Sequence, residues 1–232
     1  MKIELTPRLR MAADLVPAGA RLADVGTDHA YLPAALILEG KIPFAIAADL
    51  RLGPLTRAKE TVRQAGLMGK VAFRLCDGLS GIRPQEVDAA AIAGMGGETI
   101  AAILGAAPWT REGVPLILQP MSSMPDLRKW LQENGFTIQE ERLAREGNIL
   151  YTALSVRAGD MPPLSPAELW AGRNQNDPLR GDWLDRWIAR TRRALDGMAR
   201  ARGEETLDRR RALEEVHGGL IDMKKEWEEW QR

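Results

Sequence analysis

The chain is short of the residues that build disulfides and metal centres. Of its 232 residues, one is cysteine and two are histidine. The single cysteine, Cys76, cannot form a disulfide within the chain and suits a reducing compartment, so we expect a cytoplasmic protein. His29 and His217 are far apart in the sequence, and we therefore expect no metal site built from His and Cys ligands.

Long apolar runs and an excess of one charge are also missing. No stretch of about 18 consecutive apolar residues occurs, and residues 1–7 lack the apolar segment of a signal peptide, so no membrane association is expected. The 32 Lys and Arg residues balance 32 Asp and Glu residues. This balance argues against a uniformly basic nucleic-acid-binding surface and leaves local patches open. We expect a monomer.

The first part of the chain alternates apolar runs with helical patterns. Strands are predicted at residues 21–25, 44–49, 71–75, 87–93 and 115–119, and helices at 30–39, 54–65, 98–104 and 126–134. Residues 136–143 and 148–156 have the pattern of a closing antiparallel pair. Strands that alternate with helices favour an α/β fold with a mostly parallel sheet and helices on both of its faces.

The second part of the chain has almost no strand signal. A linker with several prolines, residues 158–166, precedes it. Ser165 is expected to cap a helix that Pro166 opens and Glu168 supports, which is a capping-box arrangement. We therefore predict two domains, residues 1–157 and 165–232.

Two long helices are predicted in this second domain, at residues 178–202 and 204–230, joined near Gly203. Their apolar residues recur at spacings of three, four and seven, so each helix is amphipathic. The expected arrangement is an antiparallel, coiled-coil-like hairpin. Its predicted core includes the tryptophans Trp183, Trp187, Trp227 and Trp230.

Chemically distinctive residues lie at or just after the ends of the first four predicted strands, at the edge where open α/β sheets bind ligands. They are Asp24, Gly26, Asp28 and His29 at the first strand, Asp49 at the second, Asp77 and Gly78 at the third, and Gly94, Met95, Gly96 and Gly97 at the fourth. A single glycine after the first strand does not make a G-x-G-x-x-G pyrophosphate motif. Acids at these ends suit an ammonium group, a ribose and an exocyclic amine. The pattern favours an S-adenosyl-methionine pocket over a nicotinamide pocket.

The segments 24–33, 77–78, 92–97 and 116–120 together resemble the bacterial tRNA (adenine-22-N1)-methyltransferase family, TrmK. The likeness covers about residues 5–156 and continues more loosely beyond. It implies a Rossmann-like class I methyltransferase domain, a coiled-coil-like C-terminal domain, and methyl transfer from S-adenosyl-methionine to N1 of an adenine in the D-arm of tRNA. In the position that follows Gln119 and Pro120, where the family pattern has Asn, this chain has Met121.

The resemblance also implies roles for individual residues. The implied cofactor-binding residues are Asp24, Gly26, Asp28 and His29 on the methionine side, Asp49 at the ribose, Asp77 and Gly78 at the adenine, and Gly94 beside them. The implied substrate side consists of Gly94, Met95 and Gly97, which would border the entry of the target base, and Gln119.

Adenine N1 is a nucleophile that needs no covalent intermediate, because the methyl donor is already activated. Positioning then supplies most of the rate. A carboxylate near N1 and N6 would stabilise the positive charge on the methylated base and could take the N6 proton. Asp28 is the candidate for this catalytic role, with the cofactor ammonium as its alternative partner. The target base must be unpaired or flipped, and Tyr31 offers it a stacking face.

Basic residues are concentrated in one stretch of the second domain. Residues 186–211 hold nine arginines and four acids. We interpret this stretch, with Arg190 and Arg193 as representatives, as a contact for tRNA phosphates, and Arg8 and Arg10 as additions near the active-site mouth. The alternative is a solvated pair of helix faces joined by ion pairs four residues apart.

The polar residues at the strand ends also have a purely structural interpretation. Asp24 and Asp49 would have this role if they capped the following helices, and His29 if it only formed a hydrogen bond at a helix start. For the chain as a whole, two different functions stay open. One is a methyltransferase for rRNA or a small molecule, and the second is an inactive, cofactor-sensing RNA-binding protein.

Overall fold

The computed structural model describes residues 3–173, 176–198 and 204–231. Contacts between Cα atoms divide the chain into two compact units, Met1–Met161 and Pro162–Arg232. The predicted turn near Gly203 and the arginines at positions 200 and 202 lie outside the described residues.

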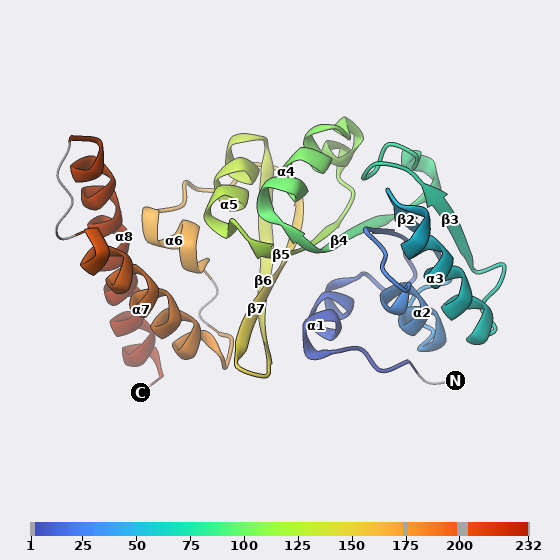
Figure 1. Ribbon diagram of the computed structural model, residues 1–232, viewed down its shortest axis with the longest axis horizontal. Coiled ribbons are helices and arrows are strands. Elements are labelled where there is room, and N and C mark those ends of the chain that lie inside the picture. Colours follow the sequence, from blue (N-terminus) through green and yellow to red (C-terminus); the bar gives the residue numbers. More distant parts are fainter. Residues whose placement is uncertain (1–2, 174–175, 199–203, 232) are drawn as a thin grey trace. The chain divides into compact units, whose positions relative to one another are not determined.

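The first unit is built on a seven-stranded sheet of order β3-β2-β1-β4-β5-β7-β6 (Figure 1). The strands are β1 (Arg21–Val25), β2 (Phe44–Asp49), β3 (Val71–Leu75), β4 (Ala89–Gly96), β5 (Leu116–Ser122), β6 (Phe136–Glu146) and β7 (Ile149–Ala158). The first five are parallel, and β7 pairs antiparallel with both β5 and β6. Every predicted strand is confirmed, including the closing antiparallel pair. The chain order reverses at β1 and β4, so their carboxyl ends flank the switch point where such sheets bind ligands.

Helices cover both faces of this sheet, as predicted. They are α1 (Pro7–Leu15), α2 (Tyr31–Leu38), α3 (Leu52–Gln64), α4 (Gly97–Gly105) and α5 (Met124–Glu133), with short 3-10 helices at Pro84–Glu86 and Pro108–Glu112. The first three pack on the face that carries Leu22 of β1, and α4 and α5 pack on the face that carries Ala23. Adjacent strand residues thus serve two different cores, because side chains alternate across a sheet.

Helix α1 is absent from the sequence prediction. Its start has a recognisable signal, since the Thr6 hydroxyl accepts a hydrogen bond from the Leu9 N–H and Pro7 occupies the first turn. The helix packs against β6 and β7, the two strands of the closing pair. The missed helix is important for the site because it carries Arg8.

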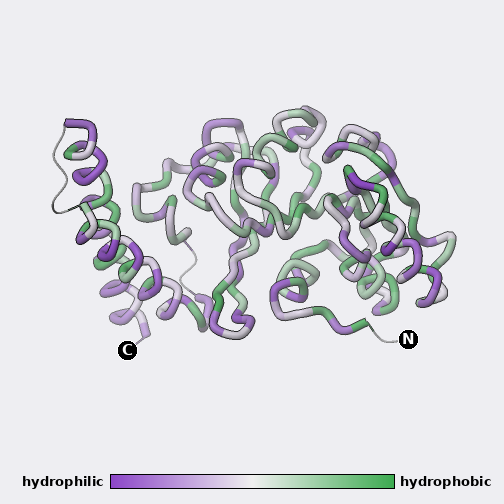
Figure 2. The backbone as a smooth tube through the Cα atoms, in the orientation of Figure 1, coloured by the Kyte–Doolittle hydropathy of each residue, from purple (hydrophilic) through white to green (hydrophobic). Residues whose placement is uncertain are grey.

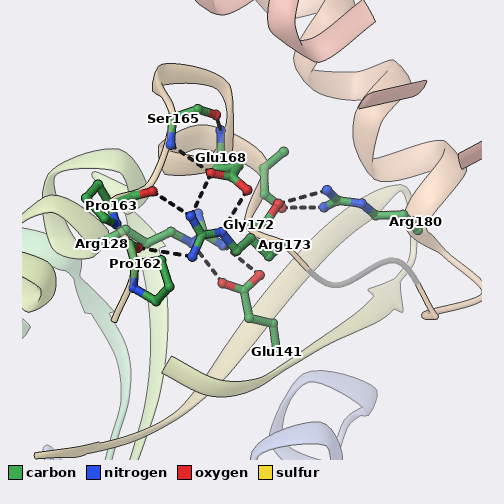
Figure 3. A network of polar contacts seen from close by, with 10 residues as sticks. Arg128, Glu141, Pro162, Pro163, Ser165, Glu168, Gly172, Arg173 and Arg180 are labelled. Carbon is green, nitrogen blue, oxygen red and sulfur yellow. Dashed lines mark hydrogen bonds and ion pairs between the residues drawn. The ribbon is translucent and has the colours of Figure 1, made fainter. Parts of the chain in front are cut away.

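The second unit contains α6 (Pro166–Ala171), α7 (Arg180–Met198) and α8 (Glu204–Trp230). The predicted capping box is confirmed: the Ser165 hydroxyl accepts from the Glu168 N–H at 3.2 Å, and the Glu168 carboxylate accepts from the Ser165 N–H at 2.7 Å. Figure 3 shows Arg173 donating to Glu168 and to backbone carbonyl groups of the preceding proline pair. The segment from the linker to the end of α6 is thus held by its own hydrogen bonds.

Helices α7 and α8 pack antiparallel, as their contacts show. The Lys224 ammonium lies 2.9 Å from the Asp185 carboxylate, and the Thr191 hydroxyl lies 2.8 Å from Nδ1 of His217. Hydrophilic and hydrophobic residues alternate along both helices (Figure 2). Among the described residues, no helix combines the length and the apolar character that crossing a bilayer requires.

The prediction for the tryptophan core of this unit is confirmed only in part. Trp183 and Trp187 are buried and pack edge to face, with 5.5 Å between their ring centroids. Trp227 packs against Gly181, where an added Cβ would lie 2.7 Å from the ring. Trp230 is 56% exposed, so its assignment to the core is wrong. Because α8 runs antiparallel to α7, Trp230 at the end of α8 lies beyond the first residue of α7.

Candidate active site

The carboxyl end of β1 presents a buried carboxylate. Asp24 is 6% exposed, and among the described residues no cation lies within ion-pair distance of it. Burial, together with the nearby charge of Asp49, raises the pKa of Asp24 to about 6. The neighbouring Thr27 hydroxyl is close enough to lower that pKa, yet it is buried and forms no hydrogen bond of ordinary geometry. A cationic, hydrogen-bonding ligand is the group that satisfies such a pair.

Asp49 ends the neighbouring strand β2 and is also nearly buried, with 9% exposure. Its Oδ1 accepts the Arg51 N–H at 2.8 Å, while the Arg51 guanidinium lies 3.9 Å away and is exposed. The backbone N–H groups of Gly26 and Thr27 both donate to the Ala48 carbonyl, which ties the loop after β1 to the end of β2. The two carboxylates therefore belong to one rigid edge.

These positions decide whether the strand-end acids are helix caps. The N-cap residue of α2 is Ala30, without a side-chain cap, so Asp24 does not cap that helix. Arg51 is the N-cap of α3, and Asp49 bonds only to its N–H, outside the helix. His29 precedes the N-cap residue of α2 and contributes no side-chain cap to it either.

The loop after β1 is unusual in its backbone. Gly26, His29 and Ala30 all have positive φ, of 74°, 72° and 53°, a conformation that costs energy for residues with a side chain. The His29 ring stacks on the Tyr31 ring, with centroids 5.1 Å apart and planes 5° from parallel. Tyr31 is 43% exposed, so the stacked pair offers an accessible aromatic surface at the start of α2.

Asp28 lies in the same loop and forms an ion pair that was not expected. Its Oδ1 accepts from Nη2 of Arg57 at 2.6 Å and from Nε at 3.2 Å. Arg57 belongs to α3 and lies 29 residues away in the sequence. No local pattern links the two residues, because the contact exists only once β1 and β2 are paired.

The end of β3 contributes an exposed acid and a glycine turn. Asp77 is exposed, and Gly78 has φ of 54°. A Cβ at Gly78 would lie 2.9 Å from the Ile103 side chain on α4. Cys76 is partly buried and packs against the core cluster that contains Ile100 and Leu104 of α4. Asp77 follows Cys76, whose N–H donates to the Asp49 carbonyl, so Asp77 lies next to the end of β2.

The end of β4 is bulged and close to β1. The pairing with β5 shifts register between Ala93 and Met95 and again before Gly96. A Cβ at Gly26 would overlap the Met95 methyl carbon, so the two loops are close, and the left-handed φ of 74° at this position favours glycine. Gly97 is constrained by space, because its Cβ would overlap the backbone carbonyl oxygen of Ser123. This edge thus leaves backbone accessible between β1 and β4.

Of the remaining predicted substrate residues, the structure brings Arg8 and Gln119 to this edge and separates Arg10 from it. Arg8 donates to the buried Gln119 side chain at 2.7 Å. Arg10 instead pairs with Glu39, at the end of α2 remote from the loop after β1. Met121, two residues after Gln119, is 44% exposed.

Arginines of the second unit are exposed on α7. The Arg190 guanidinium lies 5.2 Å from the centroid of the Trp187 ring, and Arg193 donates to the Ala189 carbonyl. Within the described ranges, Arg190, Arg192 and Arg193 have no acidic partner. An ion pair of the kind expected of a solvated helix face occurs on α8, where Arg210 pairs with Glu214 at 2.9 Å.

In the described part of the chain, no three His, Cys, Asp or Glu side chains gather as metal ligands. A switch-point edge with two buried acids at neighbouring strand ends, a glycine-rich bulge and a seven-stranded sheet with a closing antiparallel pair defines a Rossmann-like methyltransferase. The sequence profile described as "Methyltransferase domain" matches residues 5–154.

Comparison with known proteins narrows the class. The chain is 39% identical over 160 residues to the tRNA (adenine(22)-N(1))-methyltransferase of Bacillus subtilis (strain 168), which covers 68% of this chain and 67% of that protein. The crystal structure of the B. subtilis m1A22 tRNA methyltransferase TrmK aligns with a TM-score of 0.83 and 31% identity, over 96% of this chain and 100% of that chain. TrmK from M. capricolum in complex with S-adenosyl-homocysteine aligns with a TM-score of 0.79 and 26% identity, over 94% and 98%. The chain belongs to the tRNA (adenine(22)-N(1))-methyltransferase family.

Proposed function

We propose that the protein transfers the methyl group of S-adenosyl-methionine to N1 of adenine 22 in tRNA. The cofactor assignment is supported mainly by the buried Asp24 carboxylate, which lies beside Asp49 and has no cation among the described residues within ion-pair distance. The substrate assignment is supported by the relatives named above, since the family methylates this adenine. Such a protein acts in the cytoplasm, and we propose that it does so as a monomer.

The residues at the strand ends fit this cofactor. Asp24, with the Thr27 hydroxyl, would hold the cationic methionine end, and the second oxygen of Asp49 would accept from a ribose hydroxyl. Asp77 and Gly78 would hold the adenine. The bound cofactor supplies an activated methyl group on a sulfonium, so the protein needs no nucleophile of its own.

The target base requires an entry and a surface that orients it. The stacked rings of His29 and Tyr31 provide an aromatic face, and the bulge at Gly94 and Met95 lets the base approach the edge closely. Adenine N1 is on the Watson–Crick edge, so the base has to leave its helix to reach this edge. Asp28 is the carboxylate of the loop, and we assign it to the N6 amino group, where it stabilises the developing charge.

The second unit supplies phosphate contacts in this proposal. Arg190, Arg192 and Arg193 are exposed cations without acidic partners in the described residues. Their binding to the tRNA backbone would be salt-dependent and independent of the base sequence.

Methyl transfer to an unmodified tRNA transcript tests the proposal against the rival functions. We expect transfer to a transcript with adenine at position 22 and none to the matched transcript with guanine there. Transfer to small molecules or rRNA fragments but not to tRNA would contradict the substrate. Cofactor binding by calorimetry without turnover on any RNA would instead identify an inactive, cofactor-sensing protein.

A further inference from the structure

The Arg8 side chain extends from the first turn of α1 to Gln119 in β5. Its Nη1 donates to Oε1 of Gln119 at 2.7 Å, across 111 residues of sequence. Its backbone N–H donates to the Glu146 carboxylate at 3.4 Å, and its guanidinium lies 5.9 Å from the centroid of the Tyr151 ring. The side chain is thus directed inward, between α1 and the strands of the closing pair.

The Gln119 side chain is fully buried, and both its amide oxygen and its amide nitrogen form hydrogen bonds. Its Oε1 accepts a second hydrogen bond, from the Gly94 N–H at 3.1 Å, and its Nε2 donates to the Pro120 carbonyl at 3.0 Å. Because a guanidinium only donates, Arg8 requires the oxygen and not the nitrogen of the amide to face it. Arg8 therefore stabilises the same amide orientation that the Gly94 N–H and the Pro120 carbonyl require.

The Gly94 N–H needs this acceptor because it lies in the bulge of β4. The pairing of β4 with β5 skips from Ala93 to Met95, and Gly94 has φ of 78°. A bulge removes the ladder partner of the extra residue. Gln119 replaces that partner, and the position of Gly94 sets the position of Met95, whose methyl group packs on Gly26.

We propose that Arg8 is a positioning residue for methyl transfer, which acts through Gln119 on the bulge at Gly94 and not by contact with tRNA. The proposal rests on the proposed function of this site. Loss of Arg8 leaves the buried Gln119 amide with one partner fewer, so its remaining hydrogen bonds to Gly94 and Pro120 hold it less firmly, and the bulge with Met95 becomes less fixed beside β1. A buried polar group that loses its partner is costly.

A double-mutant cycle with Arg8→Met and Gln119→Met tests this. Each single variant is expected to lower kcat about tenfold with the tRNA KM unchanged, and the double variant is expected to be no slower than the Gln119 variant. Arg63→Met is the matched control, since Arg63 is exposed and pairs with Glu60 of its own helix; its kcat is expected to be unchanged. A raised tRNA KM in Arg8→Met that persists in the Gln119→Met background would overturn the proposal and make Arg8 a phosphate contact. Losses of kcat in the two single variants that add in the double variant would also overturn the proposal.

Hydrogen exchange of the Gly94 amide provides a readout that does not depend on activity. Exchange is expected to be about tenfold faster in Arg8→Met than in the wild type, with Arg8→Lys in between because a lysine ammonium still donates to Oε1. Unchanged exchange at Gly94 would contradict the proposal even if the variant is inactive. If the wild type does not methylate tRNA, the proposed function fails, while accelerated exchange would still show that Arg8 orders the bulge.

Discussion

Asp28 and Arg57 form an ion pair that joins the loop after β1 to α3, with 2.6 Å between Oδ1 and Nη2. The loop contains His29 and Ala30 in left-handed backbone conformations, and the pair holds it against α3. Both side chains are largely exposed, 66% and 48%, so the pair contributes about 0.2–1 kcal/mol and is screened by salt.

Replacing Arg57 should therefore weaken cofactor binding without removing the chemistry. For Arg57→Met we expect about two- to fivefold lower affinity in calorimetry and a smaller dependence of that affinity on salt. At saturating cofactor its kcat should equal that of the wild type. Asp28→Asn is the contrasting variant, because it should lower kcat at saturating cofactor by about 10²-fold or more. An unchanged kcat in Asp28→Asn would show that Asp28 has no catalytic role and would leave it a role in cofactor binding only.

The raised pKa of Asp24 predicts a pH dependence for cofactor binding. Burial raises that pKa to about 6, and a cationic ligand requires the ionised form, so affinity should fall as the pH drops below about 6. In the free protein the sign is opposite: the folded state binds the proton more tightly than the unfolded state, so Asp24 destabilises the fold increasingly as the pH rises from about 4 to about 6.

The variant that tests this is Asp24→Asn, which keeps the shape of the side chain and removes the charge. Above pH 6 the free variant should be more stable than the wild type by about 1–3 kcal/mol in urea unfolding. Its residual cofactor affinity should no longer change between pH 5 and about 7 through this group. A wild-type affinity that is flat across this range would show that Asp24 does not face the cationic end of the cofactor.

Asp49 offers a test with a close control. Asp49→Ala should lower cofactor affinity about 10- to 100-fold, because it removes a charged hydrogen bond to the ribose. Asp49→Asn retains an oxygen for the Arg51 N–H and should separate the local backbone bond from the ribose contact. Equal affinity of the alanine variant and the wild type would exclude Asp49 from the site.

The exposed arginines of α7 predict a separate effect on tRNA. Changing Arg190, Arg192 and Arg193 together to Glu should raise the tRNA KM at least about tenfold and reduce the salt dependence of binding by about three phosphate contacts. Cofactor affinity, measured in the absence of tRNA, is the internal control and should stay constant. Wild-type tRNA binding in this variant would give α7 a structural role only.

The sheet was predictable because its pattern is local. Short apolar runs such as Phe44–Asp49 contain both the strand and its terminal acid, and the capping box at Ser165 lies within four residues. The carboxyl ends of parallel strands lie at one edge of the sheet, so the proximity of Asp24 and Asp49 is predictable from the sequence. Features that depend on distant parts of the chain were not predicted. The contact of Arg57 with Asp28 forms only after two strands pair, and Trp230 is exposed because of the position at which α7 starts.

The same limit applies to Arg8. The sequence predicts Arg8, together with Arg10, as a phosphate contact near the active-site mouth, because a sequence shows the charge of a side chain but not its direction. The structure turns its guanidinium to the buried Gln119, which no spacing rule connects to it. The role of the residue thus depends on α1, the helix that the sequence pattern did not reveal.

Mass-spectrometric mapping of the modified nucleoside tests the proposed methyl transfer most directly. Total tRNA from a strain that lacks this modification is incubated with the protein and S-adenosyl-methionine, digested and sequenced by mass. We expect N1-methyladenosine at position 22 of the D-arm and at no other position. A methyl group on N6 of that adenine, on another nucleotide, or on no nucleotide at all would contradict the proposed function.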